Sequence, residues 1–285
     1  MISTTGENLR LLGLYIATLT VVVIGLSLFF GFTAEDSFIS LRYARNVFSG
    51  HGPIYNHGEN INAMTSPLHV FILYLFFYIT ENTELANKIM GISCAITSAA
   101  ILARAFRGNG YLVALAVATA ISPAPVLLWS VGGLETPLLL LLVTISVPLV
   151  LAIVERQQYV WNYLVLCLVG GIAFLVRYDS AIYFGPIILV VAFINGIRIW
   201  QALCWITGAI APFSWIVFSI AYYGDPLPTS FYVKTPSVDS VQANVIYIAT
   251  FLATTGLALV MLIPLASSGN ASHPRNRIPR LQATV

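Results

Sequence analysis

The stretch Thr136–Val154 reads TPLLLLLVTISVPLVLAIV and contains no charged side chain. A run of about 20 apolar residues is long enough to cross the hydrocarbon core of a bilayer as a helix. Similar runs recur along the whole chain of 285 residues, which is 58% hydrophobic and only 8% charged. A soluble core of this size does not need so much apolar surface, so the composition predicts an all-α, polytopic membrane helix bundle.

We expect about eight transmembrane helices in one domain over residues 1–266. The first run is longer than the apolar part of a signal peptide, and no convincing cleavage site follows it, so we interpret it as an uncleaved helix. The polar tail at 267–285 is expected to be disordered. The predicted spans are residues 9–32, 86–105, 111–129, 136–154, 160–176, 180–195, 199–222 and 243–266.

The short apolar stretch 66–80 decides the topology. Cytoplasmic loops of membrane proteins are enriched in Lys and Arg. If this stretch does not cross and the N-terminus is inside, eight of the 13 basic residues are cytoplasmic; if it crosses, only four are. We therefore expect both termini in the cytoplasm, a long outer loop over residues 33–87, and a re-entrant or interface-lying helix at 66–80 within that loop.

This topology places Glu35, Asp36, Glu135, Asp179 and Asp225 all on the outer face. Ionisable groups are costly near lipid, and membrane proteins that keep them usually use them. An outer-face site is therefore predicted. Solute transport is disfavoured, because transporter sites tend to lie near the bilayer midplane.

Four of these acids also have a structural interpretation. Asp36 precedes a predicted amphipathic helix and is either its N-cap or a general base or metal ligand. Glu135 suits the start of a helix, Asp179 could pair locally with Arg177, and Asp225 suits a turn. The predicted amphipathic helix, 37–49, has Arg42, Arg45 and Asn46 opposite an apolar stripe of Phe38, Leu41, Ala44 and Phe48.

The remaining polar residues exclude several classes of chemistry. The histidines of the outer loop, His51, His57 and His69, do not have the spacing of a zinc site. The three cysteines lie inside apolar runs and suit packing positions. The chain has no phosphate-binding loop, no nucleophile elbow and no dinucleotide fingerprint. We expect no organic cofactor and no nucleic-acid partner.

Several segments occur in an order that resembles a known family. They are similar to the GT-C-fold glycosyltransferases, and most similar to bacterial multi-spanning enzymes such as the mycobacterial terminal arabinofuranosyltransferases. Three substitutions depart from the family pattern: Glu35 replaces Asp in an acidic pair, Tyr178 replaces Pro, and His69 replaces Trp. The segments are EDSFISLRYARN at 35–46, GHGPIYN at 50–56, GE at 58–59, TSPL at 65–68, GLET at 133–136, RYD at 177–179 and YGDPLPTSFYVKT at 223–235.

The resemblance implies an inverting transfer of a sugar from a polyprenyl-phosphate carrier to an envelope glycan or glycolipid, on the outer (periplasmic) face of a bacterial inner membrane. Glu35 and Asp36 would hold the catalytic position and, with Glu135, the place of a divalent metal such as Mg²⁺ or Mn²⁺. The implied substrate-binding residues are Arg42, Tyr43, Glu135, Arg177, Asp179, Tyr232 and Lys234.

The resemblance leaves one alternative open. Family members normally continue with more helices and often an outer soluble domain. The resemblance therefore implies a short homologue, a truncated product, or one half of an assembly in which a partner subunit supplies the C-terminal part. The alternative is a truncated or degenerate, non-catalytic family member that binds lipid-linked sugars or scaffolds a partner enzyme.

Overall fold

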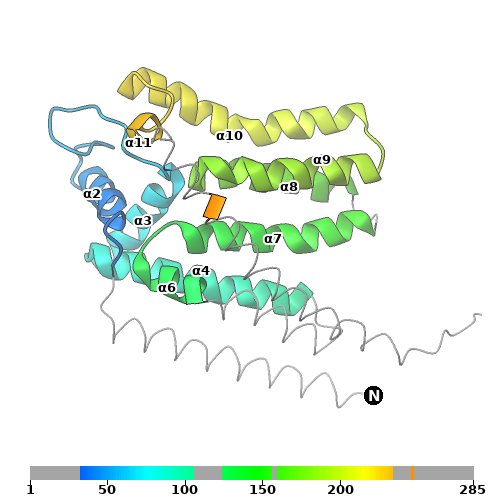
Figure 1. The fold of residues 1–285 in the computed structure, drawn as a ribbon, viewed down its shortest axis with the longest axis horizontal. Coiled ribbons are helices and arrows are strands. Elements are labelled where there is room, and N and C mark those ends of the chain that lie inside the picture. Colours follow the sequence, from blue (N-terminus) through cyan, green and yellow to red (C-terminus); the bar gives the residue numbers. More distant parts are fainter. Residues whose placement is uncertain (1–32, 106–123, 156–158, 234–244, 247–285) are drawn as a thin grey trace, which may run out of the picture. The chain divides into compact units, whose positions relative to one another are not determined.

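The structure is a computed structural model that describes residues 33–105, 124–155, 159–233 and 245–246 (Figure 1). All regular elements in these ranges are helices. They are α2 (Ser37–Phe48), α3 (Pro67–Thr80), α4 (Thr83–Ala105), α6 (Ala124–Gly132), α7 (Thr136–Val154), α8 (Tyr159–Val176), the short η1 (Tyr178–Ser180), α9 (Ala181–Ile194), α10 (Ile199–Tyr223) and α11 (Thr229–Val233).

Four of the predicted spans are confirmed as long apolar helices. α4, α7, α8 and α10 are each long and apolar enough to cross a membrane. The predicted span 180–195 is shorter than expected: α9 has 14 residues, or about 21 Å of helix, against a hydrocarbon core of about 30 Å. The predicted spans 9–32, most of 111–129 and nearly all of 243–266, together with the tail 267–285, lie outside the described residues, so the count of eight stays a prediction.

The long helices pack side by side (Figure 1). α8 lies between α7 and α10, and α7 also packs on α4. Gly171 of α8 faces Gly208 of α10 so closely that a Cβ on either glycine would overlap the other helix's backbone. Small residues allow such close approach between helices in membranes. Because successive helices alternate in direction, α4, α7 and α9 begin at the same end of the bundle where α8 and α10 finish. We call it the loop end.

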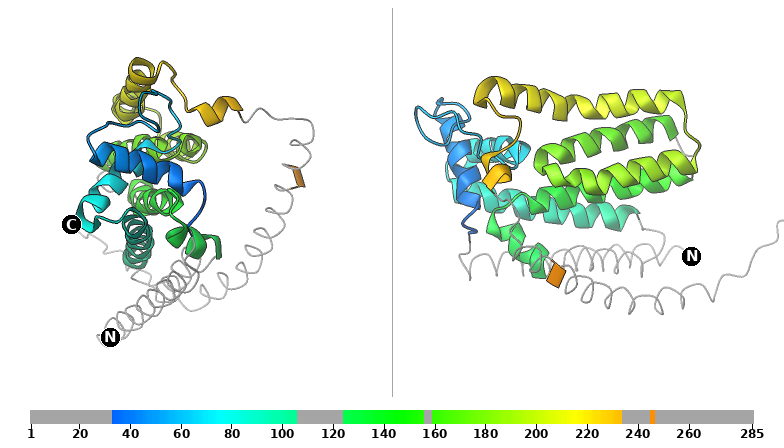
Figure 2. Two further views of the ribbon diagram at one scale, coloured as in Figure 1. Left: turned by 90° about the vertical axis from the view of Figure 1, so that its left-hand side faces the viewer. Right: turned by 45° about the horizontal axis from the view of Figure 1, so that its top comes forward.

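α2 and α3 cover the loop end. α2 lies across the ends of the long helices instead of running parallel to them (Figure 2). Leu41 and Ala44 of α2, Leu73 and Phe77 of α3, and Trp215 of α10 share one hydrophobic cluster. α3 has 14 residues and begins at Pro67, so by length it falls short of a span, as predicted for 66–80.

The amphipathic helix is confirmed, but its buried face differs from the predicted one. Leu41 and Ala44 are buried as expected, whereas Phe38 is 50% and Phe48 42% exposed. The exposed side of α2 carries Phe38 together with Arg42 and Arg45. The prediction was wrong at Phe38, and Ser37, Ser40 and Tyr43 are buried instead, because α2 packs against both α3 and α4.

Candidate functional site

The acidic pair after the first predicted span lies beside the turn that presents Glu135. The backbone N–H of Ala34 donates to the carbonyl oxygen of Gly132 at 2.8 Å. Glu35 and Asp36 follow immediately, and Glu135 comes three residues after Gly132. Two segments almost a hundred residues apart in the sequence are therefore joined by a backbone hydrogen bond at the loop end.

Gly133 allows this junction to close. Its φ is +85°, in the left-handed region that glycine adopts at little cost. A Cβ here would overlap Nδ2 of Asn87 and would approach Cβ of Ser37 to 3.3 Å. Asn87 lies on α4 and donates from Nδ2 to the Gly133 carbonyl at 2.7 Å. The turn is thus packed between the start of α2 and one face of α4.

Arg177 joins two of the predicted acids in one ionic cluster. Its Nη1 donates to Oε1 of Glu135 at 2.7 Å, and its Nε and Nη2 donate to the two carboxylate oxygens of Asp179, each at 3.0 Å. The Glu135 side chain is 9% exposed and that of Arg177 is 40% exposed. The hydrogen bonds from Arg177 to Asp179, followed by the charges of Glu135 and Asp179, raise the pKa of Arg177 above its ordinary value.

The local pair predicted between Arg177 and Asp179 is confirmed, and Glu135 joins it from 42 residues away. The cluster holds one cation and two carboxylates, so its net charge is −1. Its charge is therefore unfavourable for binding a phosphate through Arg177 alone.

Glu35 and Asp36 differ from Glu135 in having no such partner. Both are exposed, and within the described part of the chain neither takes part in an ion pair. Asp36 occupies the N-cap position of α2, but its side chain makes no capping hydrogen bond. Ser37 instead satisfies the local backbone by donating from its Oγ to the Ala34 carbonyl. The capping interpretation of Asp36 is therefore not supported by the geometry.

Two side chains of α2 organise the loop that follows it. Arg42 donates from Nε to the Tyr55 carbonyl at 2.9 Å and from Nη2 to Oδ1 of Asn56 at 2.8 Å. Its guanidinium also lies 4.5 Å from the centre of the Tyr55 ring. All of these partners are neutral, so Arg42, which is exposed, keeps its positive charge available.

Tyr43 is fully buried and holds the loop from beneath. Its hydroxyl donates to the Ile61 carbonyl at 2.5 Å and accepts from the Ala63 N–H at 3.0 Å. Burial raises the pKa of Tyr43 above its ordinary value. The predicted role of Tyr43 in substrate binding stays untested, but its hydroxyl is already used by two backbone groups.

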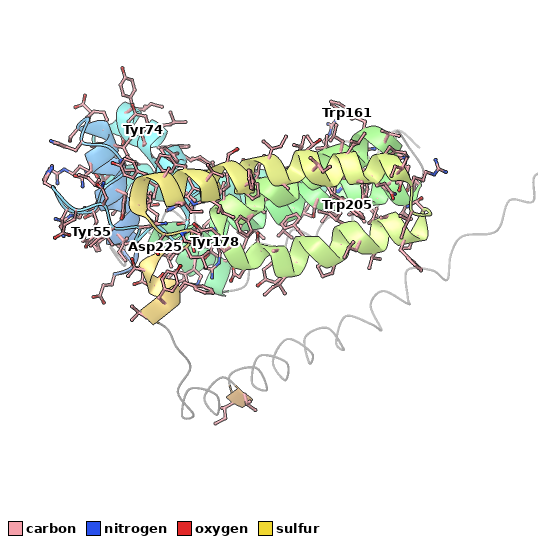
Figure 3. The ribbon with its side chains drawn as sticks, turned by 90° about the horizontal axis from the view of Figure 1, so that it is seen from above. Tyr55, Tyr74, Trp161, Tyr178, Trp205 and Asp225 are labelled. Atoms are coloured by element: carbon pink, nitrogen blue, oxygen red, sulfur yellow. The ribbon has the colours of Figure 1, made fainter. Side chains whose placement is uncertain are left out.

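The segment after α10 returns to the same loop. Tyr223 donates to the Pro53 carbonyl, and Thr229 donates from both its N–H and its hydroxyl to the Asn62 carbonyl. Tyr178 accepts a hydrogen bond from Nε1 of Trp215 on α10 at 2.9 Å. Tyr55, Tyr178 and Asp225 accordingly lie at one end of the molecule in Figure 3, away from Trp161 and Trp205. Asp225 is exposed in its turn, and so is Tyr232 in α11; Lys234 lies outside the described residues.

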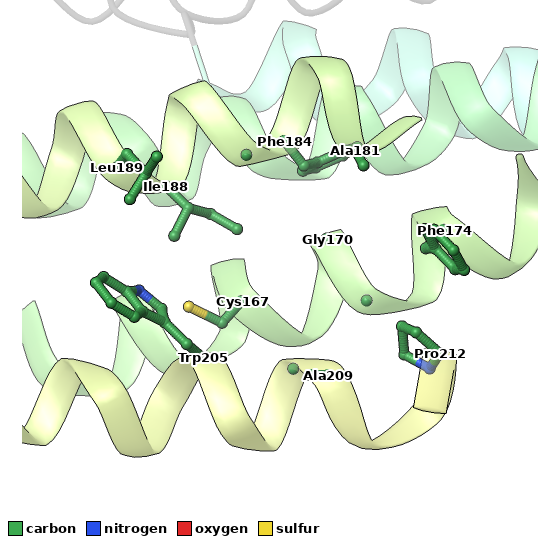
Figure 4. Close-up of a pocket in the computed structure, with 13 residues that line it drawn as sticks. Cys167, Gly170, Phe174, Ala181, Phe184, Ile188, Leu189, Trp205, Ala209 and Pro212 are labelled. Carbon is green, nitrogen blue, oxygen red and sulfur yellow. The ribbon is translucent and has the colours of Figure 1, made fainter. Parts of the chain in front are cut away.

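A separate apolar pocket of about 280 Å³ opens between α8, α9 and α10. Phe174, at the pocket's border, contacts the Tyr178 ring, with the ring centres 5.1 Å apart. The pocket therefore begins next to Arg177–Asp179 and runs away from them along the helices. The labelled residues that surround it are Cys167, Gly170, Phe174, Ala181, Phe184, Ile188, Leu189, Trp205, Ala209 and Pro212 (Figure 4).

The predicted metal ligands do not converge on one point. Within the described ranges, no group of three His, Cys, Asp or Glu side chains is placed to hold a metal ion. Glu135 is paired with Arg177, while Glu35 and Asp36 face solvent. This arrangement does not fit an ion held by protein side chains alone. The divalent metal stays a prediction.

Sequence reasoning missed Asn87 and did not connect Glu135 with Arg177. A lone Asn near the start of an apolar helix has no motif spacing that would mark it. The one signal in the sequence was its position before a long apolar run, because an amide buried there would need a hydrogen-bond partner.

Comparison with known proteins agrees with the resemblance drawn from the motifs. The chain is similar to a protein of Mycobacterium tuberculosis named terminal beta-(1->2)-arabinofuranosyltransferase, with 26% identity over 255 residues, which cover 81% of this chain and 40% of that protein. A protein of Corynebacterium glutamicum with the same name is 26% identical over 255 residues, covering 80% of this chain and 35% of that protein. This chain thus spans about two-fifths or less of the length of these relatives. No family model and no solved structure matches it.

Proposed function

We propose that the loop end carries the site of an inverting membrane glycosyltransferase. The donor is a sugar on a polyprenyl-phosphate carrier, and the acceptor is a glycan or glycolipid of the bacterial cell envelope. The name of both relatives favours an arabinofuranosyl group as the sugar. The observation that carries the proposal is the exposed pair Glu35–Asp36, which has no ion-pair partner among the described residues and is joined through Ala34 and Gly132 to the turn of Glu135.

The chemistry requires a base and a way to accommodate a leaving phosphate. One carboxylate of the pair takes the proton from the acceptor hydroxyl as its oxygen attacks the anomeric carbon. The bond from that carbon to the phosphate oxygen breaks, and the phosphate leaves with the electron pair. Glu35 and Asp36 suit the base because neither is neutralised by a cation among the described residues, whereas Glu135 is.

Arg42 is a better candidate than Arg177 for contacting the phosphate. Arg177 already binds two carboxylates, while Arg42 binds only neutral groups and remains exposed. Arg42 follows Asp36 by six residues of helix, an axial rise of about 9 Å. A cation at that distance favours the developing charge on the leaving group while leaving room for the sugar.

The apolar pocket between α8, α9 and α10 supports a donor with a lipid tail. It begins beside Tyr178 and is lined by apolar and small residues. An isoprenoid chain lying there would keep its phosphate near the loop end. The outer-face orientation of that end is supported by the count of basic residues over the whole sequence.

The proposal is tested by incubating the purified chain in lipid nanodiscs with radiolabelled polyprenyl-phosphate arabinose and cell-envelope glycan acceptors. We expect labelled glycan and free polyprenyl phosphate to form in equal amounts. If the chain binds the donor but transfers no sugar, the enzyme proposal is rejected in favour of the non-catalytic binder. Addition of a chelator in a parallel arm tests the metal: loss of transfer that Mg²⁺ or Mn²⁺ restores would support it.

A further inference from the structure

Beneath the junction of Glu35–Asp36 with the Gly132–Gly133 turn lies a buried polar side chain that the proposed reaction does not use. Asn87 is only 2% exposed, and its Nδ2 donates to the Gly133 carbonyl. Its Oδ1 has no hydrogen-bond partner among the described residues. An amide buried in this way is unfavourable unless its one strong hydrogen bond compensates for the lost contacts with water.

The contacts around Asn87 show what that hydrogen bond holds in place. Gly91, one helical turn along the same face of α4, lies so close to α6 that a Cβ would overlap the Ser130 carbonyl. The α6 helix ends at Gly132, and the turn follows at once. Two residues of α4 therefore hold this segment in place. Gly91 packs closely against α6, and Asn87 forms a hydrogen bond with the turn. No other side chain donates to the Gly133 carbonyl in the part of the chain that the structure describes.

From Asn87 a short series of contacts leads to the proposed base. The Gly133 carbonyl that Asn87 holds is next to Gly132, whose carbonyl accepts from the Ala34 N–H. Ala34 is the residue before Glu35. The same turn contacts Ser37, the first residue of α2, at the position where Gly133 lacks a Cβ. The two carboxylates thus lie between Ala34 and Ser37, the two residues through which this segment contacts the turn.

We infer that Asn87 is a positioning residue: by fixing the Gly132–Gly133 turn on α4, it sets the place of Glu35–Asp36 relative to the Arg177 cluster. The inference rests on the proposed function for its catalytic meaning, but the positioning itself is a property of the fold. A base displaced by about 1 Å can cost roughly 100-fold in rate. Release of the turn should therefore lower kcat much more than it weakens donor binding.

The kinetic test compares Asn87→Leu, which has a similar volume and no donor, with the wild type in nanodiscs. We expect kcat to fall about 10- to 100-fold, with the donor KM changed by less than about threefold. Ser98→Ala is the matched control, because Ser98 is also fully buried on α4 but bonds only within its own helix. Asn87→Asp, which keeps the size of the side chain but has no donor when ionised, is the second variant if Asn87→Leu does not fold.

A spectroscopic measurement separates this inference from the proposed function. Spin labels are placed at Glu35→Cys and Ile182→Cys, two exposed positions at the loop end, in a protein whose three buried cysteines are replaced by alanine. We expect the pulsed electron paramagnetic resonance distance distribution to broaden with Asn87→Leu and not with Ser98→Ala. An unchanged distribution would overturn the inference whatever the kinetics show. A broadened distribution, together with no transfer by the unlabelled wild-type protein, would uphold the positioning and reject the proposed function.

Discussion

At the scale of single residues, the most informative side chain is Arg177. It binds a buried carboxylate from a distant segment and an exposed carboxylate two residues away. Removing one member of a buried ion pair costs more than the pair contributes, because the remaining charge is left without a partner in a poorly solvated place. Arg177 therefore stabilises the loop end mainly by keeping Glu135 neutralised.

We predict that Arg177→Gln lowers the free energy of unfolding by about 2–4 kcal/mol, less than for a fully buried pair because water reaches Arg177. Glu135→Gln combined with Arg177→Gln should be less destabilising than Arg177→Gln alone. The measurement is denaturation in detergent micelles for the wild type, both single variants and the double variant. Strictly additive effects would show that the two side chains do not stabilise the loop end as a pair.

A second residue-scale prediction concerns pH. His69 of α3 is fully buried, and no hydrogen bond of good geometry reaches either ring nitrogen from the described residues. Burial lowers the pKa of His69 to about 4, although the nearby Asn87 side chain favours the protonated ring. In the unfolded chain His69 therefore becomes protonated below about pH 6.5, whereas in the folded chain it becomes protonated only below about pH 4.

The contribution of His69 to stability is thus complete above pH 6.5 and is lost as the pH falls toward 4, by at most roughly 3 kcal/mol. Because carboxylates also titrate in this range, the test is a comparison of pH profiles. The His69→Leu variant should lose stability less steeply than the wild type between pH 6.5 and 4. The matched variant His57→Leu, at an exposed loop position, should follow the wild type. Parallel profiles for His69→Leu and the wild type would refute the prediction.

At the scale of elements, local sequence patterns identified the helices, whereas tertiary packing determined which face of each helix is buried. α2 and the long helices follow from apolar spacing and run length, so their existence could be predicted. The burial of Tyr43 and the exposure of Phe38 could not, because both depend on how α2 packs against distant segments. In the same way, Arg177–Asp179 is a local pair and could be predicted, whereas Glu135–Arg177 and Asn87–Gly133 depend on how α4, α7 and α8 pack.

The turn between α6 and α7 gives the element-scale prediction. Gly133→Ala places a Cβ at a residue with positive φ and against the Asn87 amide. We expect it to destabilise the protein by at least about 1–2 kcal/mol and to reduce transfer. Gly185→Ala in α9 is the control, because a Cβ there meets open space and alanine favours a helix. Equal melting temperatures for the two variants would contradict the packing of the turn on α4.

At the scale of the whole molecule, the acidic pair Glu35–Asp36 and the acids Glu135, Asp179 and Asp225 all lie at the loop end, as expected when an even number of crossings separates them. The structure places them together through Ala34–Gly132, Glu135–Arg177 and the contacts of the Asp225 segment with the loop. Which side of the membrane the loop end faces was predicted from basic residues along the whole sequence. That orientation depends on the membrane, so it needs a measurement in cells.

We predict that Thr65→Cys, exposed at the loop end, reacts with a membrane-impermeant maleimide in intact cells. Ile197→Cys, exposed between α9 and α10 at the opposite end, should react only after the membrane is opened. The three natural cysteines are buried, so background labelling should be low. Labelling of Ile197→Cys and not Thr65→Cys in intact cells would show that the topology is the reverse of the predicted one.

The central claim is that the Glu35–Asp36 pair provides the base for transfer from a lipid-phosphate sugar. The most direct measurement is the rate of sugar transfer by Glu35→Gln, Asp36→Asn and the double variant, with donor binding measured on the same samples. Glu84→Gln is the matched control, an exposed carboxylate in the first turn of α4. We predict that at least one single variant loses about 100-fold or more of the rate while donor binding and the Glu84→Gln rate stay unchanged. A double variant that transfers sugar at the wild-type rate would contradict the claim.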